Sequence, residues 1–284
     1  MVSAYRPATL EEAVRIRAEE QAIPLAGGTD LMARRRRHSG LAPVFARPAL
    51  FLAHLPELRI VSATSDVLTI GAAVTLTDLL ADERAPGILR EAVGRMASPA
   101  IRNVATLGGN VCNASPAGDT LPALYGLNAR LVLVGPRGER RVPIEGFILG
   151  PIKTDLNEDE LLRAIELPTA SFDVSYYRKV GTRQANALSK LSFLGLSSLQ
   201  EGRIRDVRIA FGAVAPTVVR SAVLERTLVG CTRQEAAAAR SEVLDGYAKS
   251  IAPIDDQRSS ADYRKTVALN LLADFLEACF DQRV

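Results

Sequence analysis

Short apolar runs and a few helical periods alternate along the chain, and together they predict a mixed architecture. Apolar side chains recur at helical spacing from Leu10 to Ala18, after a capping pattern of Thr9 and Glu12, so an amphipathic helix is expected there. The runs Leu131 to Val134 and Leu161 to Leu167 are short, apolar and bounded by turn residues, which is typical of strands. The pattern therefore favours an α+β fold.

The same reasoning assigns the rest of the chain in outline. Further strands are expected at Ile23 to Ala26, Phe51 to Leu52, Leu58 to Val61, Leu68 to Ile70, Arg141 to Ile144, Ser175 to Val180, Ala187 to Leu199 and Val207 to Val214. Further helices are expected from Thr77 into Leu80, and over Ile88 to Met96, Leu121 to Leu127, Arg233 to Lys249 and Ser260 to Phe280. Pro136 to Gly138 predicts a hairpin turn, and Ile148 to Leu156 a loop.

A polar, turn-rich segment, PTASFD at residues 168 to 173, predicts a domain boundary. We expect one domain over residues 1–172, with parts of about 1–55 and 56–172, and a smaller α+β domain over residues 173–284. The second domain begins with the β-rich segments and ends with the two long helices.

Composition narrows the possible functions. The 284 residues are 48% hydrophobic and 24% charged, and the net charge of +3 is too balanced to indicate a nucleic-acid partner by itself. Three scattered Cys and two His predict neither a metal centre nor histidine-based catalysis, so a bound cofactor would carry any redox chemistry. The N-terminus lacks a signal-peptide pattern and no apolar run reaches the roughly 20 residues of a bilayer span, so a cytoplasmic protein is expected.

Two glycine-containing stretches carry the candidate chemistry. The first, IPLAGGTDLMARRRR at residues 23 to 37, reads as a strand, a turn at Gly27 and Gly28, and a helix capped by Thr29 or Asp30. Free N–H groups at such a turn suit a phosphate, although a tight turn with nothing bound has the same pattern. The third glycine of a Rossmann fingerprint and the GK[ST] of a P-loop are both missing.

The second stretch is ATLGGNVCNASPAGD, residues 105 to 119. We expect a loop in which Gly108 and Gly109 take positive φ angles and let a ligand approach the main chain. Thr106, Asn110 and Asn113 add short polar groups beside bare N–H donors, a chemistry suited to phosphate, ribose or ribityl oxygens. The alternative is a glycine-rich surface loop that binds nothing.

The run Arg34 to Arg37 leaves three interpretations open. The first is a solvated helix face on which Asp30 and Arg34 pair at i,i+4 spacing. A nucleic-acid patch is less favoured, because no aromatic residues interleave the run. The third is a surface that faces a partner subunit or an anionic end of the ligand.

Taken in order, the motifs resemble those of one family over nearly the whole chain. LAGGTDL, IRNVATLGGNVCNASPAGDTLPAL, PIKTDLNEDELLRAIELP, YYRKVGTRQANALSKLSF and IRDVRIAFGAVAPTVVR are similar to the FAD-binding medium subunit of the molybdenum hydroxylases, the family of xanthine dehydrogenase and carbon monoxide dehydrogenase. The resemblance implies a two-part FAD-binding domain of the PCMH or vanillyl-alcohol-oxidase-like type. It also implies a C-terminal α+β domain with a three-stranded antiparallel sheet and helices.

The resemblance also implies how FAD is held. Ala26 to Leu31 would wrap the pyrophosphate, with N–H donors from Gly27, Gly28 and Thr29. Ala105 to Asn110 would form a second wall. The full set of implied cofactor-binding residues in these two stretches is Ala26, Gly27, Gly28, Thr29, Asp30, Leu31, Ala105, Thr106, Gly108, Gly109, Asn110, Cys112, Asn113 and Ala114.

Outside the glycine pairs, the implied contacts are fewer. Cys112 to Ala114 would lie beside the flavin or ribityl chain, and Asp119 would accept a hydrogen bond from a cofactor hydroxyl. Leu156 would lie near the adenine or the flavin edge, and Lys190 would be placed toward FAD from the second domain. No His lies in either stretch, so noncovalent FAD is expected. Gly28 stands where animal xanthine dehydrogenases have Asn, so that group's side-chain contact is not carried over.

The implied function is electron transfer within a larger oxidoreductase. Electrons would pass from a large molybdopterin subunit and a small 2Fe-2S subunit to FAD, and then to NAD⁺ or another acceptor, in a dimer of heterotrimers. This chain would hold no catalytic hydroxylation residue and no metal. One alternative is a self-contained FAD-dependent reductase related to the enolpyruvate reductases, which would need a protonating residue such as Ser175 or Ser192. The other is a non-catalytic protein that uses the arginine run for interactions.

Overall fold

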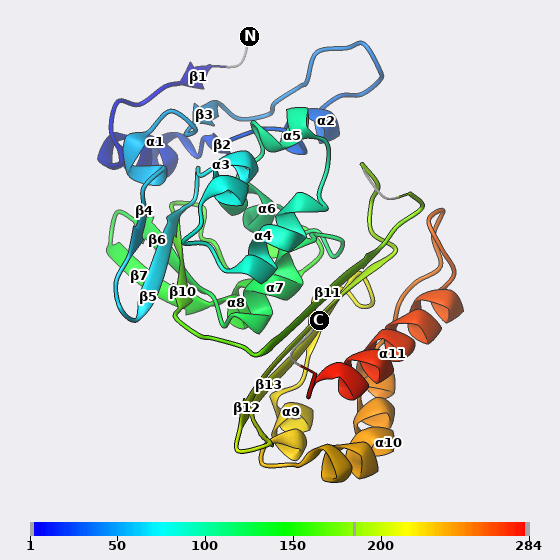
Figure 1. Cartoon of the computed structure of the whole chain (residues 1–284). Coiled ribbons are helices and arrows are strands. Elements are labelled where there is room, and N and C mark those ends of the chain that lie inside the picture. The colour runs from blue at the N-terminus through cyan, green and yellow to red at the C-terminus, as the bar shows by residue number, and fades with distance from the viewer. Residues whose placement is uncertain (1–2, 184–185, 282–284) are drawn as a thin grey trace. The chain divides into compact units, whose positions relative to one another are not determined.

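The computed structural model describes residues 3–183 and 186–281, and it has the predicted α+β fold. Its internal contacts divide the chain into two compact units (Figure 1). The first unit consists of Met1–Ala85, Ala97–Ala114 and Asn128–Thr169, and the second of Pro86–Met96, Ser115–Leu127 and Ala170–Val284. Two segments of the N-terminal half thus fold with the C-terminal part.

The first unit begins with a small parallel sheet whose strand order is β1 (Ala4–Tyr5), β3 (Ala49–Phe51), β2 (Ile23–Leu25). Helix α1 (Leu10–Glu20) connects β1 to β2, as the periodicity predicts. The Thr9 side chain accepts a hydrogen bond from the Glu12 N–H at 3.1 Å, and Glu12 in turn accepts one from Ala8. The buried face of α1 includes Ala13, Val14 and Ile16.

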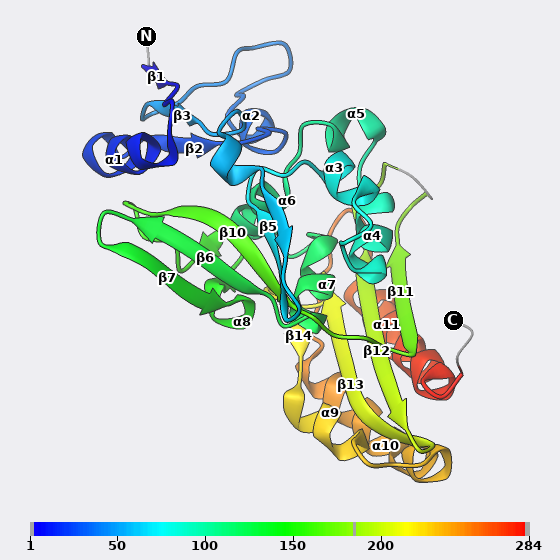
Figure 2. The same ribbon diagram turned by 60° about the vertical axis from the view of Figure 1, so that its left-hand side comes forward.

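The first unit also contains an antiparallel five-stranded sheet (Figure 2). Its order is β4 (Val61–Ala63), β5 (Val67–Gly71), β10 (Leu161–Pro168), β6 (Arg130–Gly135), β7 (Gly138–Pro143). The predicted hairpin joins β6 and β7. Shorter elements are η1 (Pro56–Leu58), α8 (Ile144–Phe147), β8 (Ile148–Gly150) and β9 (Lys153–Thr154). Part of the predicted 148–156 loop is therefore a small hairpin.

The short helices of the N-terminal half differ in detail from the prediction. Helix α3 (Leu76–Ala81) is capped by Thr75, whose side chain accepts from Asp78, so the expected start at Thr77 is wrong. Helix α4 is Gly87–Gly94, and Ser98 caps α5 (Pro99–Arg102). The largest difference is α6 (Leu107–Asn113), which occupies much of the predicted glycine loop. No helix in the described ranges 3–183 and 186–281 is long and apolar enough to cross a bilayer.

The second unit is built on an antiparallel sheet of four strands, one more than expected: β11 (Val174–Val180), β12 (Leu191–Gln200), β13 (Arg203–Gly212) and the short β14 (Val219–Arg220). Besides α4, its helices are α7 (Thr120–Gly126), α9 (Ala222–Leu228), α10 (Arg233–Ser250) and α11 (Ala261–Ala278). A capping box of Thr232 and Glu235 starts α10. Residues 187–190, expected in a strand, precede β12.

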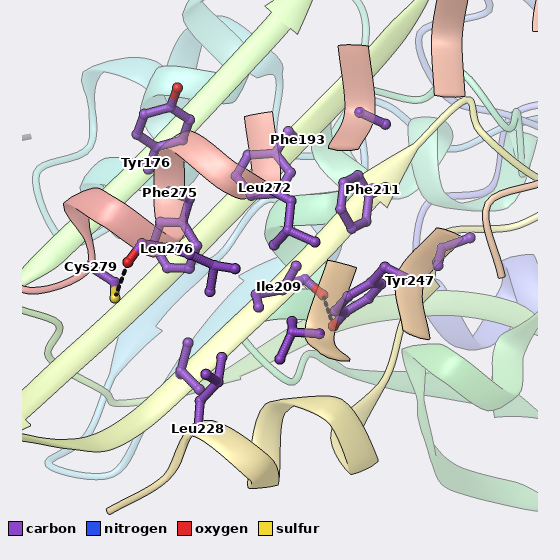
Figure 3. Packing of buried hydrophobic residues seen from close by; sticks show 14 of the residues in the cluster. Tyr176, Phe193, Ile209, Phe211, Leu228, Tyr247, Leu272, Phe275, Leu276 and Cys279 are labelled. Atoms are coloured by element: carbon purple, nitrogen blue, oxygen red, sulfur yellow. Dashed lines mark hydrogen bonds between the residues drawn. The ribbon is translucent and has the colours of Figure 1, made fainter. Parts of the chain in front are cut away.

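A group of aromatic side chains lies within the largely aliphatic core between this sheet and its C-terminal helices (Figure 3). The rings of Phe193 and Phe211 lie 5.0 Å apart edge to face, and Phe275 from α11 and Tyr247 from α10 pack beside them. Edge-to-face rings add to the stability gained from burial. Gly195 is required here, because a Cβ at that position would enter the ring of Phe275.

Acidification is expected to destabilise the first unit through Glu160. Arg140 donates to both carboxylate oxygens of Glu160, at 2.7 and 2.8 Å, and these bonds lower the pKa of that carboxyl to about 2 from an ordinary 4.5. A carboxyl whose pKa is lowered by folding stabilises the protein above its unfolded pKa, and that stability is lost as the pH falls from about 4.5 toward 2. The pair should contribute on the order of 2 kcal/mol at pH 7, since Arg140 is partly exposed.

Urea unfolding of Glu160→Gln and the parent protein at pH 7 and pH 2.5 measures this contribution. The difference in free energy of unfolding should be large at pH 7 and much smaller at pH 2.5. Glu83→Gln, at an exposed position, is the control and should change little at either pH. An equal loss for Glu160→Gln at both pH values would contradict the assignment.

Candidate functional site

The first glycine stretch connects β2 to α2 (Leu31–Arg34). Gly28 has a φ of 70°, which favours glycine, and its carbonyl accepts from the Met32 N–H at 2.9 Å. Asp30 occupies the N-cap position, but its side chain does not cap the helix as expected. Within the described part of the chain, no hydrogen bond uses the N–H of Gly27, Gly28 or Thr29 as donor. These three amides are therefore available to an anionic ligand.

Residues 107–113 of the second stretch form helix α6, whereas residues 115–119 are irregular as the predicted loop requires. Thr106 is the N-cap of α6, and its side chain accepts from the Gly109 N–H at 3.0 Å. The N–H groups of Leu107 and Gly108 donate to the carbonyls of Val74 and Ala72, at 3.1 and 3.0 Å. Gly108 and Gly109 have ordinary helical φ angles, so the expectations of positive φ and of bare N–H donors are wrong here. The amides of Leu107, Gly108 and Gly109 are therefore used within the protein.

The glycines of the two stretches have different roles. A Cβ on Gly27 would overlap the carbonyl of Val104, so Gly27 lets the two stretches touch. A Cβ on Gly108 would lie 2.6 Å from the carbonyl oxygen of Ala72, so Gly108 lets α6 pack closely. Gly109 is exposed, and its Cβ would meet only the Thr106 hydroxyl. Gly109 therefore leaves a bare patch of main chain at the surface, which fits the close approach of a cofactor.

A side-chain hydrogen bond also ties the two stretches together. The Asn113 Nδ2 donates to Asp30 Oδ2 at 2.8 Å, although 83 residues separate them. The carboxylate fixes the orientation of the amide, because the reverse orientation would place two acceptor oxygens together. Asn113 Oδ1 is then buried and has no hydrogen-bond partner in the described residues. A buried acceptor without a donor is costly, and a cofactor hydroxyl or N–H would satisfy it.

The other residues of the second stretch lie near Asn113 in the sequence. Burial raises the pKa of the Cys112 thiol to about 12, so Cys112 is a neutral, partly buried side chain at pH 7 rather than a nucleophile. Ala114 ends α6 with a φ of 45°, and its carbonyl accepts from the Ile152 N–H at 3.0 Å. The Ala105 carbonyl accepts from Leu76, and Asn110 is hydrogen-bonded. Much of this stretch is thus held in place by the protein itself.

Leu156 lies partly buried in the first unit, just after β9. The bond from Ile152 to Ala114 brings the β8–β9 hairpin, which precedes Leu156, to the end of α6. The contact of Leu156 with a cofactor remains a prediction.

Asp119 and Lys190 belong to the second unit. Asp119 is buried at the start of α7, where the Lys179 Nζ donates to Oδ2 at 2.8 Å and the Ser189 hydroxyl donates to Oδ1. Burial raises the pKa of Asp119, and these two donors oppose that shift. The Lys190 ammonium lies 4.8 Å from the centre of the Tyr263 ring.

The sequence interpretation missed Lys179 and Ser189. The Lys179 side chain is only 6% exposed, and lysine is rarely so buried unless it is paired, as it is here with Asp119. The alternation YYRKV placed it in a strand, but no local pattern identifies its partner 60 residues earlier. Both oxygens of Asp119 are engaged internally, so its cofactor contact stays a prediction.

Asn113→Ala is expected to weaken FAD binding about tenfold, because the variant removes a buried acceptor. Asp30→Ala should weaken it less, since Asp30 only orients the amide. Titration of apoprotein with FAD, followed by flavin fluorescence, gives both dissociation constants. Asn270→Ala, at an exposed position of α11, is the control. An unchanged dissociation constant for Asn113→Ala would remove its role.

Comparison with known proteins identifies the family of the chain. Residues 1–170 match the family described as the FAD binding domain in molybdopterin dehydrogenase, and residues 175–279 match the CO dehydrogenase flavoprotein C-terminal domain. The xanthine dehydrogenase FAD-binding subunit of Escherichia coli O157:H7 is 34% identical over 273 residues, covering 92% of this chain and 90% of that protein. The carbon monoxide dehydrogenase medium chain of Hydrogenophaga pseudoflava is 27% identical, with 97% and 96% covered.

A solved structure has the same fold. The carbon monoxide dehydrogenase from Hydrogenophaga pseudoflava that lacks the Mo-pyranopterin moiety of the molybdenum cofactor superposes with a TM-score of 0.88 at 27% identity, covering 99% of this chain and 98% of that one. The chain belongs to the FAD-binding medium subunits of the xanthine dehydrogenase and carbon monoxide dehydrogenase family. It is an oxidoreductase component, and its cofactor is FAD.

The two alternatives from the sequence lose support. Family membership excludes a non-catalytic interaction protein. A self-contained reductase would need a protonating residue that the substrate can reach. Ser192 is fully buried, and its hydroxyl lies only 2.5 Å from where a Cβ on Gly212 would be, so this hydroxyl is not open to a substrate. Ser175 is only partly buried, on edge strand β11, so burial does not close it off in the same way.

Proposed function

We propose that the two joined glycine stretches of the first unit hold FAD, and that the chain passes electrons between partner redox centres and an acceptor. One observation carries the proposal. The hydrogen bond between Asp30 and Asn113 fixes the orientation of the Asn113 amide, whose buried Oδ1 has no hydrogen-bond partner among the described residues, and three main-chain N–H groups of the adjoining turn have none there either. A dinucleotide requires both kinds of group, N–H donors for the pyrophosphate and fixed polar groups for its hydroxyls.

The proposed roles follow the chemistry of each residue. The amides of Gly27, Gly28 and Thr29 donate to the pyrophosphate, and Gly109 leaves room for it. Asn113 accepts from a cofactor hydroxyl or N–H. The remaining cofactor-binding residues in the proposal are Ala26, Asp30, Leu31, Ala105, Thr106, Gly108, Asn110, Cys112, Ala114, Asp119, Leu156 and Lys190.

FAD, when bound, supplies electron transfer in one- and two-electron steps. The chain's own groups bind and orient FAD. The Cys112 thiol is neutral and the buried side chains of α6 are apolar, so neither supplies a nucleophile that would react with the flavin. We assign no catalytic residue to the chain. The domain division proposed with this function is residues 1–172 for FAD binding and 173–284 for the C-terminal domain, which the two family matches support.

The proposed assembly contains a small 2Fe-2S subunit and a large molybdopterin subunit, arranged as a dimer of heterotrimers, with NAD⁺ or another carrier as acceptor. The relatives support it, because they include a medium chain of carbon monoxide dehydrogenase and a subunit of xanthine dehydrogenase. Three free cysteines are consistent with a cytoplasmic location.

Purification of the complex from its host, with an absorbance spectrum and mass spectrometry, tests the proposal. We expect a flavin band near 450 nm, FAD released on denaturation without a covalent adduct, and companion chains carrying the iron–sulfur and molybdopterin centres. A chain that cannot take up FAD would overturn the binding proposal. A lone chain that turns over substrate would overturn the electron-transfer role.

A further inference from the structure

An arginine-rich surface segment of the first unit is not among the residues proposed to hold FAD. The segment, which we name the arginine loop, consists of residues 34–47 and runs from the end of α2 toward β3. Arg34, Arg36 and Arg37 are exposed, whereas Arg35 is partly buried with its guanidinium 5.9 Å from the centre of the Phe45 ring. Three cationic groups therefore point to the surface along one short piece of chain.

The charge of the arginine loop is not neutralised by the protein. No Asp or Glu occurs between Leu31 and Pro56. Within residues 3–183 and 186–281, Arg47 pairs with Glu158 at 3.6 Å, while Arg34, Arg36 and Arg37 form no ion pair, including the pair with Asp30 that the i,i+4 spacing suggested. Asp30 is instead engaged by Asn113. Guanidinium groups stay charged at every physiological pH, so this loop carries a permanent positive field that reaches about 8 Å in cellular salt.

Apolar side chains accompany these charges. The Val44 N–H donates to the Arg35 carbonyl at 2.9 Å, which folds the loop back on itself beside the arginine run. Val44 is 50% exposed and Leu41 is 52% exposed. Arginine beside exposed apolar groups is typical of protein–protein interfaces. Single-stranded nucleic acid would need free aromatic faces for stacking, and Phe45 is partly buried under Arg35.

We propose that the arginine loop docks onto another protein chain of the assembly, at a surface where several carboxylates surround an apolar patch. The inference rests on the proposed function, because it needs a multi-chain complex. The carboxylates pair with Arg34, Arg36 and Arg37, and the apolar patch covers Leu41 and Val44. The loop thereby contributes to the rate and specificity of assembly.

Substitution of the three exposed arginines tests the charge. The variant Arg34→Gln/Arg36→Gln/Arg37→Gln should bind the companion subunits about tenfold more weakly at low salt, and the difference should shrink at high salt. Its flavin absorbance per chain should equal that of the parent protein. A control removes the same charge from three exposed arginines elsewhere, which form no ion pair with any residue that the structure describes: Arg6→Gln/Arg130→Gln/Arg226→Gln. Binding of the first variant equal to that of the control would overturn the proposal.

Photo-crosslinking identifies the partner surface. A benzophenone amino acid at Leu41 of the full complex should crosslink to an acidic peptide of a companion subunit, and the same probe at Ile254, which is 69% exposed in the second unit, is the comparison site. A crosslink to RNA, or none in an intact complex, would overturn the proposal. If the parent protein has no flavin or no companion chains, the proposed function fails instead, so the two failures are distinguishable.

Discussion

Gly27→Ala is expected to abolish FAD retention while leaving the second unit folded. The added methyl would overlap the Val104 carbonyl, which is backbone and cannot move aside as a flexible side chain can. The turn would therefore separate from the segment before α6, and the Asp30–Asn113 hydrogen bond that joins the two stretches would lengthen or break. Flavin content per chain, measured from the 450 nm band, should fall by more than tenfold.

A matched control distinguishes this effect from the general cost of an added methyl. Gly146→Ala lies in the same unit, on α8, where the new Cβ would meet only ordinary contacts at 3.8 Å. This variant should keep full flavin content and nearly the parent stability. Full flavin content in Gly27→Ala as well would mean that close contact of the two stretches is not needed for binding.

Asp119→Ala is expected to lower the free energy of unfolding of the second unit by about 3–5 kcal/mol. The substitution leaves the Lys179 ammonium, which is only 6% exposed, without its carboxylate partner. Lys179 keeps only the Arg95 carbonyl at 3.0 Å, and the Ser189 hydroxyl loses its acceptor. Urea unfolding monitored by tyrosine fluorescence and circular dichroism gives the change.

A double substitution separates the structural role of Asp119 from its predicted role toward FAD. Asp119→Leu/Lys179→Met removes both charges, and apolar replacement of a buried pair is often neutral for stability. The double variant should therefore be much more stable than Asp119→Ala. Weak FAD binding in this stable variant would support a cofactor contact, whereas parent-like affinity would show that the pair is structural. A double variant as unstable as Asp119→Ala would contradict the buried-charge explanation.

Local pattern predicted much of the fold. Helical periodicity and the Thr9 and Glu12 pattern identified α1, and alternating or apolar runs located β6, β10 and β11. These signals work because the period of the apolar residues follows directly from which face each element buries. The order of several motifs along the chain was enough to recognise the family, which the comparisons confirm.

The glycine stretch at residues 105–119 was misread because its composition argues against a helix. Glycine has a low helix propensity, and a pair of glycines beside asparagines is typical of a turn. Propensity is outweighed here by the Thr106 cap and by the hydrogen bonds to Ala72 and Val74, which are distant in sequence. The same tertiary contacts give Gly108 its role, since it is small enough to pack against Ala72.

The sequence by itself determined the fold class and the family, and it predicted the two stretches proposed to bind FAD, because each of these depends on neighbouring residues and on motif order. Only the tertiary structure decided which groups face each other. Asp30 meets Asn113 across 83 residues, and Asp119 meets Lys179 and Ser189 across 60 and 70. No periodicity encodes such pairings, because they depend on how separate elements pack. That packing makes Leu107–Asn113, within the expected loop, a helix that is capped by Thr106 and fixes the position of Asn113.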